Sequence, residues 1–311
     1  MKYRARALNA DLEISLEREG LRLGSRFVDF ADLRALIPMN HRVLLDTLAG
    51  ERIEISMLGF SYDGFWEELT GLFSARNREA LFLEGEPIMS VEGEYCAQTE
   101  RGRGRIELYP DSVCILPPSS AAMRIPLFFT KELRQEGYVL RLIAEDGAEF
   151  TVGRMGYDTM PFAERMQKAA DKTRRERAAL LEKIRLQAPF RHAGLFRTTQ
   201  TELSWQAACG DGCCAVELFT GEDAATYLYR YREPKELFLR QLVRAMEAMG
   251  PHREIIWLSV EQLAAKPVYR MAVDRCPAVR YLRERSAGRI IHNQTHAQRL
   301  AEFLGTAAER N

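Results

Sequence analysis

The sequence predicts an α+β fold, mainly β, built from repeated small curled antiparallel sheets or barrels that are each capped by a C-terminal helix. Three observations predict it. A strand–strand–helix unit recurs along the chain, its strands alternate apolar and polar residues, and its helices carry a narrow apolar stripe. A helix with one apolar stripe that directly follows the last hairpin of a sheet has to bury that stripe against the sheet.

The recurring unit consists of an apolar strand, a turn with glycine or acidic residues, a second strand, an aromatic-containing joint and an amphipathic helix. Its turns, such as Ala49-Gly50-Glu51 and Glu145-Asp146-Gly147, suit β-hairpins. Its helices repeat apolar residues at helical spacing, as at Phe65, Leu69 and Phe73. Four copies span residues 43–73, 139–170, 216–246 and 278–307, and the last departs most from the pattern.

Further strands are predicted upstream of the first two copies. Leu12, Ile14 and Leu16 alternate with charged residues, and a turn separates them from a strand at 21–23. The other strand segments are 27–30 before the first copy, and 94–99, 106–108, 113–116 and 123–129 before the second. Several short strands ahead of a single helix are typical of a curled antiparallel sheet or small barrel.

This pattern resembles the pleckstrin-homology-like (PH-like) fold, in particular its bacterial members. The matching segments are 12–23, 27–33 and 43–57 with the helix that follows, and in the second copy 105–116, 124–127 and 138–170. The resemblance covers about residues 1–80 and 88–185. It implies a binding role, since PH-like domains bind phosphoinositide headgroups, bind peptides or proteins, or act as scaffolds. The fold has no invariant catalytic residues.

The resemblance and the linkers predict three domains. The first PH-like module spans 1–83, and the second spans 88–170 with a helical extension at 171–187. The C-terminal α+β domain, 190–311, is either one domain or includes a third, degenerate PH-like unit. Its predicted elements are a hairpin over 205–219, a strand at 254–258, a short helix at 260–265 and a strand at 268–273.

Composition excludes several classes of protein. The chain has 311 residues, of which 46% are hydrophobic and 28% charged, as in soluble globular proteins. Lys+Arg and Asp+Glu both number 44, so a dedicated nucleic-acid binder is not expected. No apolar run is long enough for a transmembrane segment, and no signal peptide is evident, so we expect a cytoplasmic protein with reduced cysteines.

A candidate ligand site is the basic segment Arg101-Gly102-Arg103-Gly104-Arg105, predicted as a hairpin loop of the second module. Arginine offers paired donors to a phosphate, and the flanking glycines permit close approach of the backbone. Arg101, Arg103 and Arg105 are therefore candidate ligands for an anionic lipid headgroup. The alternative interpretation, which the sequence favours, is a solvated basic hairpin tip.

The cysteines offer a candidate metal site at Cys209, Cys213 and Cys214. A structural zinc site usually has two ligand pairs, and here the second pair is missing. The favoured alternative is a hairpin that turns at Gly210-Asp211-Gly212 and buries small cysteines in its strands. No metal or other cofactor is therefore expected.

Sequence motifs for catalysis are also missing. His292 and His296 are four residues apart, but 293–295 suit a helix start, so the two histidines are not expected to share a helix face. The sequence thus favours a non-enzymatic scaffold that binds another protein through its PH-like modules. Binding of an anionic headgroup or phosphate is the first alternative, and an enzyme with its site in 190–311 is the second.

Overall fold

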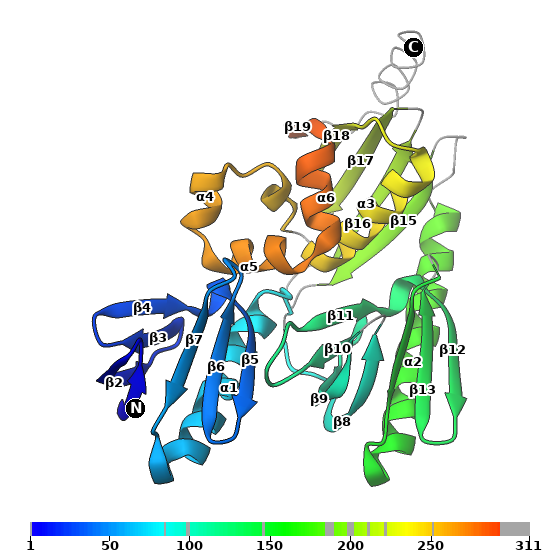
Figure 1. Ribbon diagram of the computed structural model, residues 1–311. Coiled ribbons are helices and arrows are strands. Elements are labelled where there is room, and N and C mark those ends of the chain that lie inside the picture. The colour runs from blue at the N-terminus through cyan, green and yellow to red at the C-terminus, as the bar shows by residue number, and fades with distance from the viewer. Residues whose placement is uncertain are drawn as a thin grey trace.

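The computed structural model describes residues 2–83, 85–97, 100–144, 147–183, 190–197, 202–209, 212–220, 223–250 and 252–292. The fold is α+β and mainly β, which confirms the predicted class. Two curled seven-stranded antiparallel sheets lie side by side, and a third sheet of five strands stands above them with its helices (Figure 1).

The first module is a seven-stranded sheet followed by one helix. Its strand order is β4-β3-β2-β1-β7-β6-β5, so the first strand lies at the centre and pairs with both β2 and β7. Its elements are β1 (Lys2–Ala7), β2 (Ala10–Leu16), β3 (Gly20–Leu23), β4 (Arg26–Asp29), η1 (Phe30–Asp32), β5 (Leu33–Met39), β6 (Arg42–Thr47), β7 (Arg52–Ser56), η2 (Gly59–Ser61) and α1 (Tyr62–Glu79).

The second module repeats this topology element by element. Its strand order is β11-β10-β9-β8-β14-β13-β12, again with the first strand at the centre. Its elements are β8 (Met89–Ala97), β9 (Glu100–Leu108), β10 (Ser112–Leu116), β11 (Met123–Pro126), η3 (Leu127–Phe129), β12 (Thr130–Glu136), β13 (Val139–Ala144), β14 (Glu149–Gly153), η4 (Gly156–Asp158) and α2 (Thr159–Lys183). The duplication that the first two copies predict is confirmed.

Each module buries the apolar stripe of its helix against the inner face of its sheet. Phe65, Leu69 and Phe73 of α1 are fully buried in the core of the first module. Phe162 and Met166 of α2 are fully buried in the second. The predicted helical extension belongs to α2, which continues unbroken to Lys183, while 184–187 lie outside the described residues.

The C-terminal unit contains a five-stranded antiparallel sheet in the order β15-β16-β17-β18-β19, and so differs from the seven-stranded modules. The predicted hairpin is confirmed as β16 and β17. Its elements are β15 (Phe190–Arg197), β16 (Glu202–Cys209), β17 (Cys213–Thr220), β18 (Asp223–Arg230), α3 (Lys235–Met249), η5 (Arg253–Ile256), α4 (Val260–Ala264), α5 (Pro267–Arg275), α6 (Pro277–Arg285) and β19 (Ala287–His292).

Three predictions for this unit are wrong. The expected strand at 254–258 is mostly the 3-10 turn η5, and the expected strand at 268–273 lies within the helix α5. The fourth copy begins with the helix α6 where a strand was expected. In the two helices, Pro267 and Pro277 each occupy the first turn, where a missing N–H costs nothing and the fixed φ suits helix entry.

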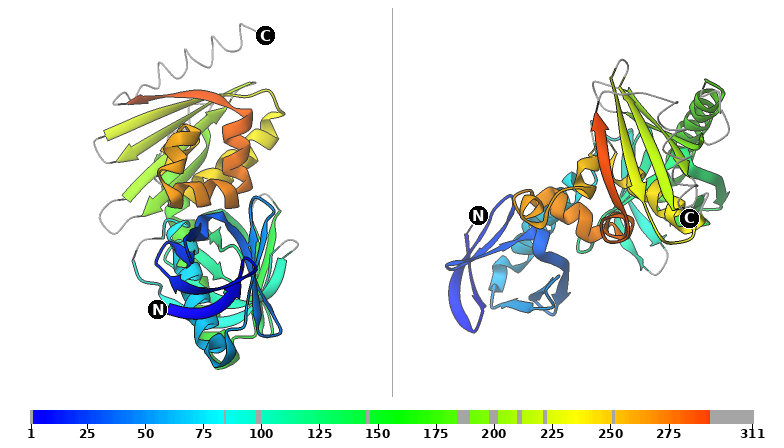
Figure 2. Two further views of the ribbon diagram at one scale, coloured as in Figure 1. Left: turned by 60° about the vertical axis from the view of Figure 1, so that its left-hand side comes forward. Right: turned by 90° about the horizontal axis from the view of Figure 1, so that it is seen from above.

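Helices of the C-terminal unit join it to both modules (Figure 2). Arg275 on α5 donates to the carbonyl oxygens of Phe30 and Leu33 at 3.4 and 2.8 Å, and its guanidinium lies 5.2 Å from the centre of the Phe73 ring. Phe128 of the second module is buried in the core of the C-terminal unit. The three units therefore meet at one junction.

Candidate functional site

The predicted basic loop is part of a strand. Arg101, Arg103 and Arg105 lie within β9 and not in a loop, and the tip of the hairpin, 98–99, is outside the described residues. The segment alternates as a strand does, so the three arginines share the exposed outer face of the sheet. In the register with β8, Arg103 lies opposite Glu94 and Arg105 lies opposite Glu92.

Two of these arginines line a shallow groove on the outer face of the second module. The groove has a volume of about 540 Å³ and includes Arg101, Arg103, Glu94 and Arg154. Glu94 forms an ion pair with Arg154 at 3.2 Å, and Arg105 lies outside the groove, 3.8 Å from Glu92. The structure thus separates Arg105 from the other two and places carboxylates beside the basic charge.

The candidate metal cysteines do not converge. Cys209 and Cys214 lie opposite each other on β16 and β17 and form a disulfide, so the expectation of reduced thiols is wrong for this pair. Cys213 is a neighbour of Cys214 on one strand, and successive strand residues point to opposite faces. Among the residues that the structure describes, no group of three metal-ligating side chains could hold an ion. His292 ends β19, and His296 lies outside the described residues.

A larger concave surface lies between the second module and the C-terminal unit, and we call it the interunit cleft. It has a volume of about 650 Å³. Ile125, Pro126 and Phe150 contribute apolar surface from the second module, and Leu239 and Val243 contribute it from α3. The charged residues along the cleft are Arg124, Glu236, Arg240, Arg244 and Glu247.

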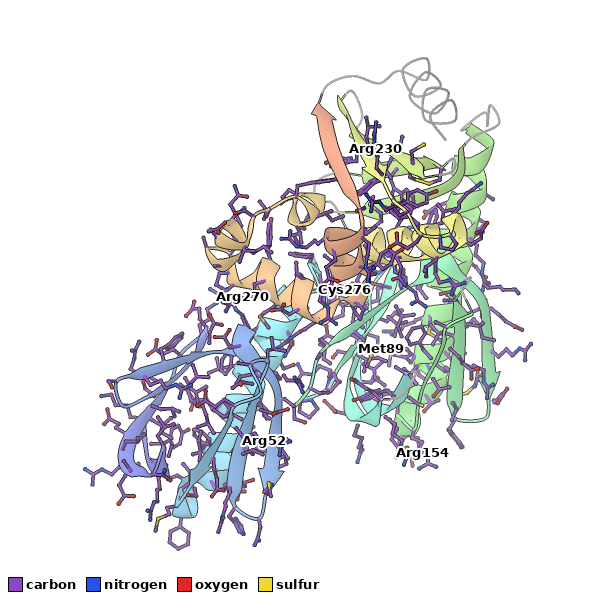
Figure 3. The ribbon with its side chains drawn as sticks, turned by 45° about the horizontal axis from the view of Figure 1, so that its top comes forward. Arg52, Met89, Arg154, Arg230, Arg270 and Cys276 are labelled. Atoms are coloured by element: carbon purple, nitrogen blue, oxygen red, sulfur yellow. A yellow bond between two sulfur atoms is a disulfide. The ribbon has the colours of Figure 1, made fainter. Side chains whose placement is uncertain are left out.

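A second cavity of about 300 Å³ adjoins the cleft at the junction of the three units. Arg124, Phe150 and Cys276 line both spaces. Arg124 is held by Asp111 at 2.9 Å and donates to the carbonyl oxygen of Leu81 at 3.4 Å, so it connects the second module to the end of the first. Figure 3 labels Cys276 where the C-terminal unit approaches the second module.

Electrostatics at the junction favour binding over nucleophilic chemistry. Burial lowers the pKa of Arg275 to about 10, against the opposing effect of Asp274, and the side chain stays charged at neutral pH. Burial also raises the pKa of the Cys276 thiol, which therefore remains protonated and a poor nucleophile. The arrangement offers apolar surface and fixed guanidinium donors, which are suited to recognition.

The sequence contained little that identifies this cleft. Arg124, Leu239 and Arg240 come from segments more than 100 residues apart, and no local motif links them. Cys276 and Pro277 line the junction only because of tertiary packing.

Among the described residues, no helix combines the length and apolarity needed to cross a bilayer. No protein-family model matches the chain, and no curated protein matches it.

Proposed function

We propose that the chain is a non-enzymatic scaffold whose two N-terminal modules are PH-like and which binds a protein partner in the interunit cleft. The tandem seven-stranded sheets, each with a central first strand and a C-terminal helix, support the PH-like assignment. The cleft carries the binding role, because it combines an apolar floor with a charged rim in one concave surface.

The partner segment is expected to combine apolar and acidic side chains. Phe150, Leu239 and Val243 are half-buried in the free protein, so a partner that covers them removes further apolar surface from water. Arg240 is exposed on the rim, and its guanidinium suits a carboxylate of the partner. An apolar centre with a polar rim is the usual anatomy of a protein interface.

Photo-crosslinking from the cleft tests this proposal. With p-benzoylphenylalanine in place of Leu239, irradiation in the source cells is expected to join the chain to one protein species. The same amino acid in place of Val260, which is exposed on α4 outside the cleft, is the matched control. A partner product that weakens on Arg240→Glu supports the proposal. No product from position 239, or the same product from both positions, would overturn it.

The basic groove gives a second candidate function, the binding of an anionic headgroup or a free phosphate. Arg101, Arg103 and Arg154 line one concavity, which favours an anion, while Glu94 offsets part of their charge. Sedimentation with anionic vesicles at low salt and equilibrium dialysis with inorganic phosphate distinguish the two sources. Binding that is unchanged when Arg101, Arg103 and Arg105 are all replaced by alanine would exclude this candidate.

A further inference from the structure

Six of the ten large apolar side chains that are exposed in the described part of the chain gather in two places. The first apolar tip comprises Met39, Met57 and Phe60, and the second comprises Tyr138, Tyr157 and Met160. Phe60 and Tyr157 are 109% and 102% exposed, so almost no packing within the chain involves them. Side chains that stay in water contribute no burial to folding, so their recurrence in both modules requires another cause.

The joint between the last strand and the helix is built in the same way in both modules. A residue of positive φ is followed by a buried anchor, a glycine of positive φ and the exposed aromatic residue. The φ angles are 62° at Met57 and 56° at Gly59 in the first module, and 54° at Arg154 and 61° at Gly156 in the second. A Cβ at either glycine would meet nothing within 4 Å, so crowding does not explain the glycines. They allow the left-handed backbone conformation that directs the aromatic side chain outward.

A neighbouring hairpin turn completes each apolar tip. The rings of His41 and Tyr62 lie 5.3 Å apart, which joins the β5–β6 turn to the start of α1. The amide of Arg154 donates to the carbonyl oxygen of Tyr138 at 3.0 Å, which joins the β12–β13 turn to η4.

Both apolar tips lie at the same end of the molecule. Figure 1 shows that α1 and α2 begin at the lower end, away from the C-terminal unit, and Figure 3 labels Arg154 at the lower end of the second module. The C-terminal unit holds the two modules at their other end through Arg275 and Phe128. A single flat surface can therefore contact both tips.

We infer that the two apolar tips insert together into the interfacial region of a lipid bilayer and dock the scaffold on a membrane surface. The tips protrude and are separate, and a bilayer offers a continuous apolar target that takes both at once. Aromatic side chains favour the depth of the lipid headgroups, and flexible thioethers adapt to disordered neighbours. Two weak insertions by one molecule reinforce each other, because the first raises the effective concentration for the second.

Insertion of the two apolar tips does not require an anionic bilayer. Arg42 lies 3.1 Å from Glu54, and Arg154 lies 3.2 Å from Glu94, so acidic groups offset part of the basic charge at both tips. Asp158 adds a further acidic group within the second joint. Binding then depends on apolar burial and responds little to salt. This inference goes beyond the protein-scaffold function and uses different residues, so either can fail while the other stands.

Flotation of the full chain with phosphatidylcholine vesicles tests the inference. The wild-type chain is expected to float with the vesicles equally at low and at high salt. Phe60→Ser and Tyr157→Ser are each expected to lower the partition coefficient about tenfold, which corresponds to the loss of one buried aromatic side chain. The double variant is expected to remain in solution. Because both side chains are exposed, circular dichroism should be unchanged by either substitution.

Val260→Ser is the matched control, since Val260 is 74% exposed on α4 and lies outside both tips. It is expected to leave flotation unchanged. Phe60→Trp adds a spectroscopic readout, because insertion shifts the indole emission to shorter wavelength. Flotation that is unaffected by Phe60→Ser and Tyr157→Ser, or equally reduced by Val260→Ser, would overturn the inference. Self-association without lipid that Phe60→Ser abolishes would also overturn it, because the tips would then join copies of this chain.

Discussion

The aromatic residue between the last strand and the helix is exposed in one region of the molecule and buried in another. In the two modules the joint aromatic residues, Phe60 and Tyr157, are fully exposed. In the C-terminal unit Tyr231, which lies between β18 and α3, is 5% exposed and stacks on Phe238, with ring centroids 4.0 Å apart and an interplanar angle of 5°. The sequence pattern of strand, aromatic joint and helix is shared, so the pattern alone does not decide burial.

The backbone before the aromatic residue accounts for the difference. Gly59 and Gly156 precede the exposed residues and adopt positive φ, which turns the chain away from the sheet. Tyr231 instead follows β18 without an intervening glycine, and Pro234 precedes α3. The ring of Tyr231 therefore remains over the core. The C-terminal unit uses its joint for packing, whereas the modules leave theirs free for contact with a surface.

The largest expected effect on the free energy of unfolding comes from replacing Tyr231, in comparison with Phe60 and Tyr157. Tyr231→Ser should lower the free energy of unfolding by about 3–5 kcal/mol, because it leaves a cavity beside Phe238. Phe60→Ser and Tyr157→Ser should change it by about 0.5 kcal/mol or less. Urea titrations followed by circular dichroism measure all three. Comparable losses at Phe60 and Tyr231 would contradict the contrast between the two regions.

A smaller effect is expected at the contact between the C-terminal unit and the first module. Arg275→Ala removes the donor to the Phe30 and Leu33 carbonyl oxygens and should cost about 2–3 kcal/mol, as for hydrogen bonds to a charged group. Small-angle scattering should also report a wider separation of the units. Arg280→Ala, at an exposed position on α6, is the matched control and should change neither quantity. An unchanged scattering profile for Arg275→Ala would show that other contacts suffice.

Alkaline pH should destabilise both regions through tyrosines that donate to glutamates. Burial, together with Glu68 for Tyr3 and Glu254 for Tyr269, raises the pKa of each phenol to about 12. Since the unfolded phenols ionise near pH 10, their contribution to stability is complete below pH 10 and is lost as pH rises to about 12. Urea midpoints should therefore fall less steeply above pH 10 in the double variant Tyr3→Phe, Tyr269→Phe. Urea midpoints that fall equally steeply above pH 10 in the wild type and in the double variant would contradict this assignment.

The smallest effects concern the glycines of the two modules. Gly59→Ala and Gly156→Ala should each cost about 1 kcal/mol, because both force a side chain into the left-handed region. Gly64→Ala and Gly71→Ala, inside α1 with open space around the added methyl group, should instead raise stability by about 0.5–1 kcal/mol. The midpoint of thermal unfolding shows whether each substitution raises or lowers stability. A stabilising effect of Gly59→Ala would remove the backbone explanation of the joint.

The sequence predicts much of the fold because alternation and helical stripes are local properties. The hairpins and both capping helices of the modules follow from them, but they do not predict β1. Tyr3, Ala5 and Ala7 alternate with basic residues there, and alanine is a weak apolar signal, although β1 is the central strand of its sheet. Val268 and Val273 predict a strand here, because valine favours strands, but Pro267 in the first turn and the tertiary packing of Met271 and Ala272 favour the helix α5.

The candidate sites were harder to predict for a different physical reason. The interunit cleft exists only after α3 has packed near the second module, so its lining residues have no sequence proximity. The exposed aromatics were visible as a motif, yet an aromatic residue in a joint is ordinarily expected to be buried. Their outward direction depends on the φ angles of two glycines, which the sequence permits but does not specify.

Depth measurement by electron paramagnetic resonance shows whether the two apolar tips enter the bilayer. With exposed Cys96 replaced by serine, nitroxide labels are attached at Phe60→Cys, Tyr157→Cys or Val260→Cys, and power saturation is measured on phosphatidylcholine vesicles. Both module labels are expected to lie below the headgroups, accessible to oxygen and protected from a water-soluble nickel chelate, while the label at position 260 stays in water. Labels at 60 and 157 that both remain in water, or that differ from each other, would contradict it.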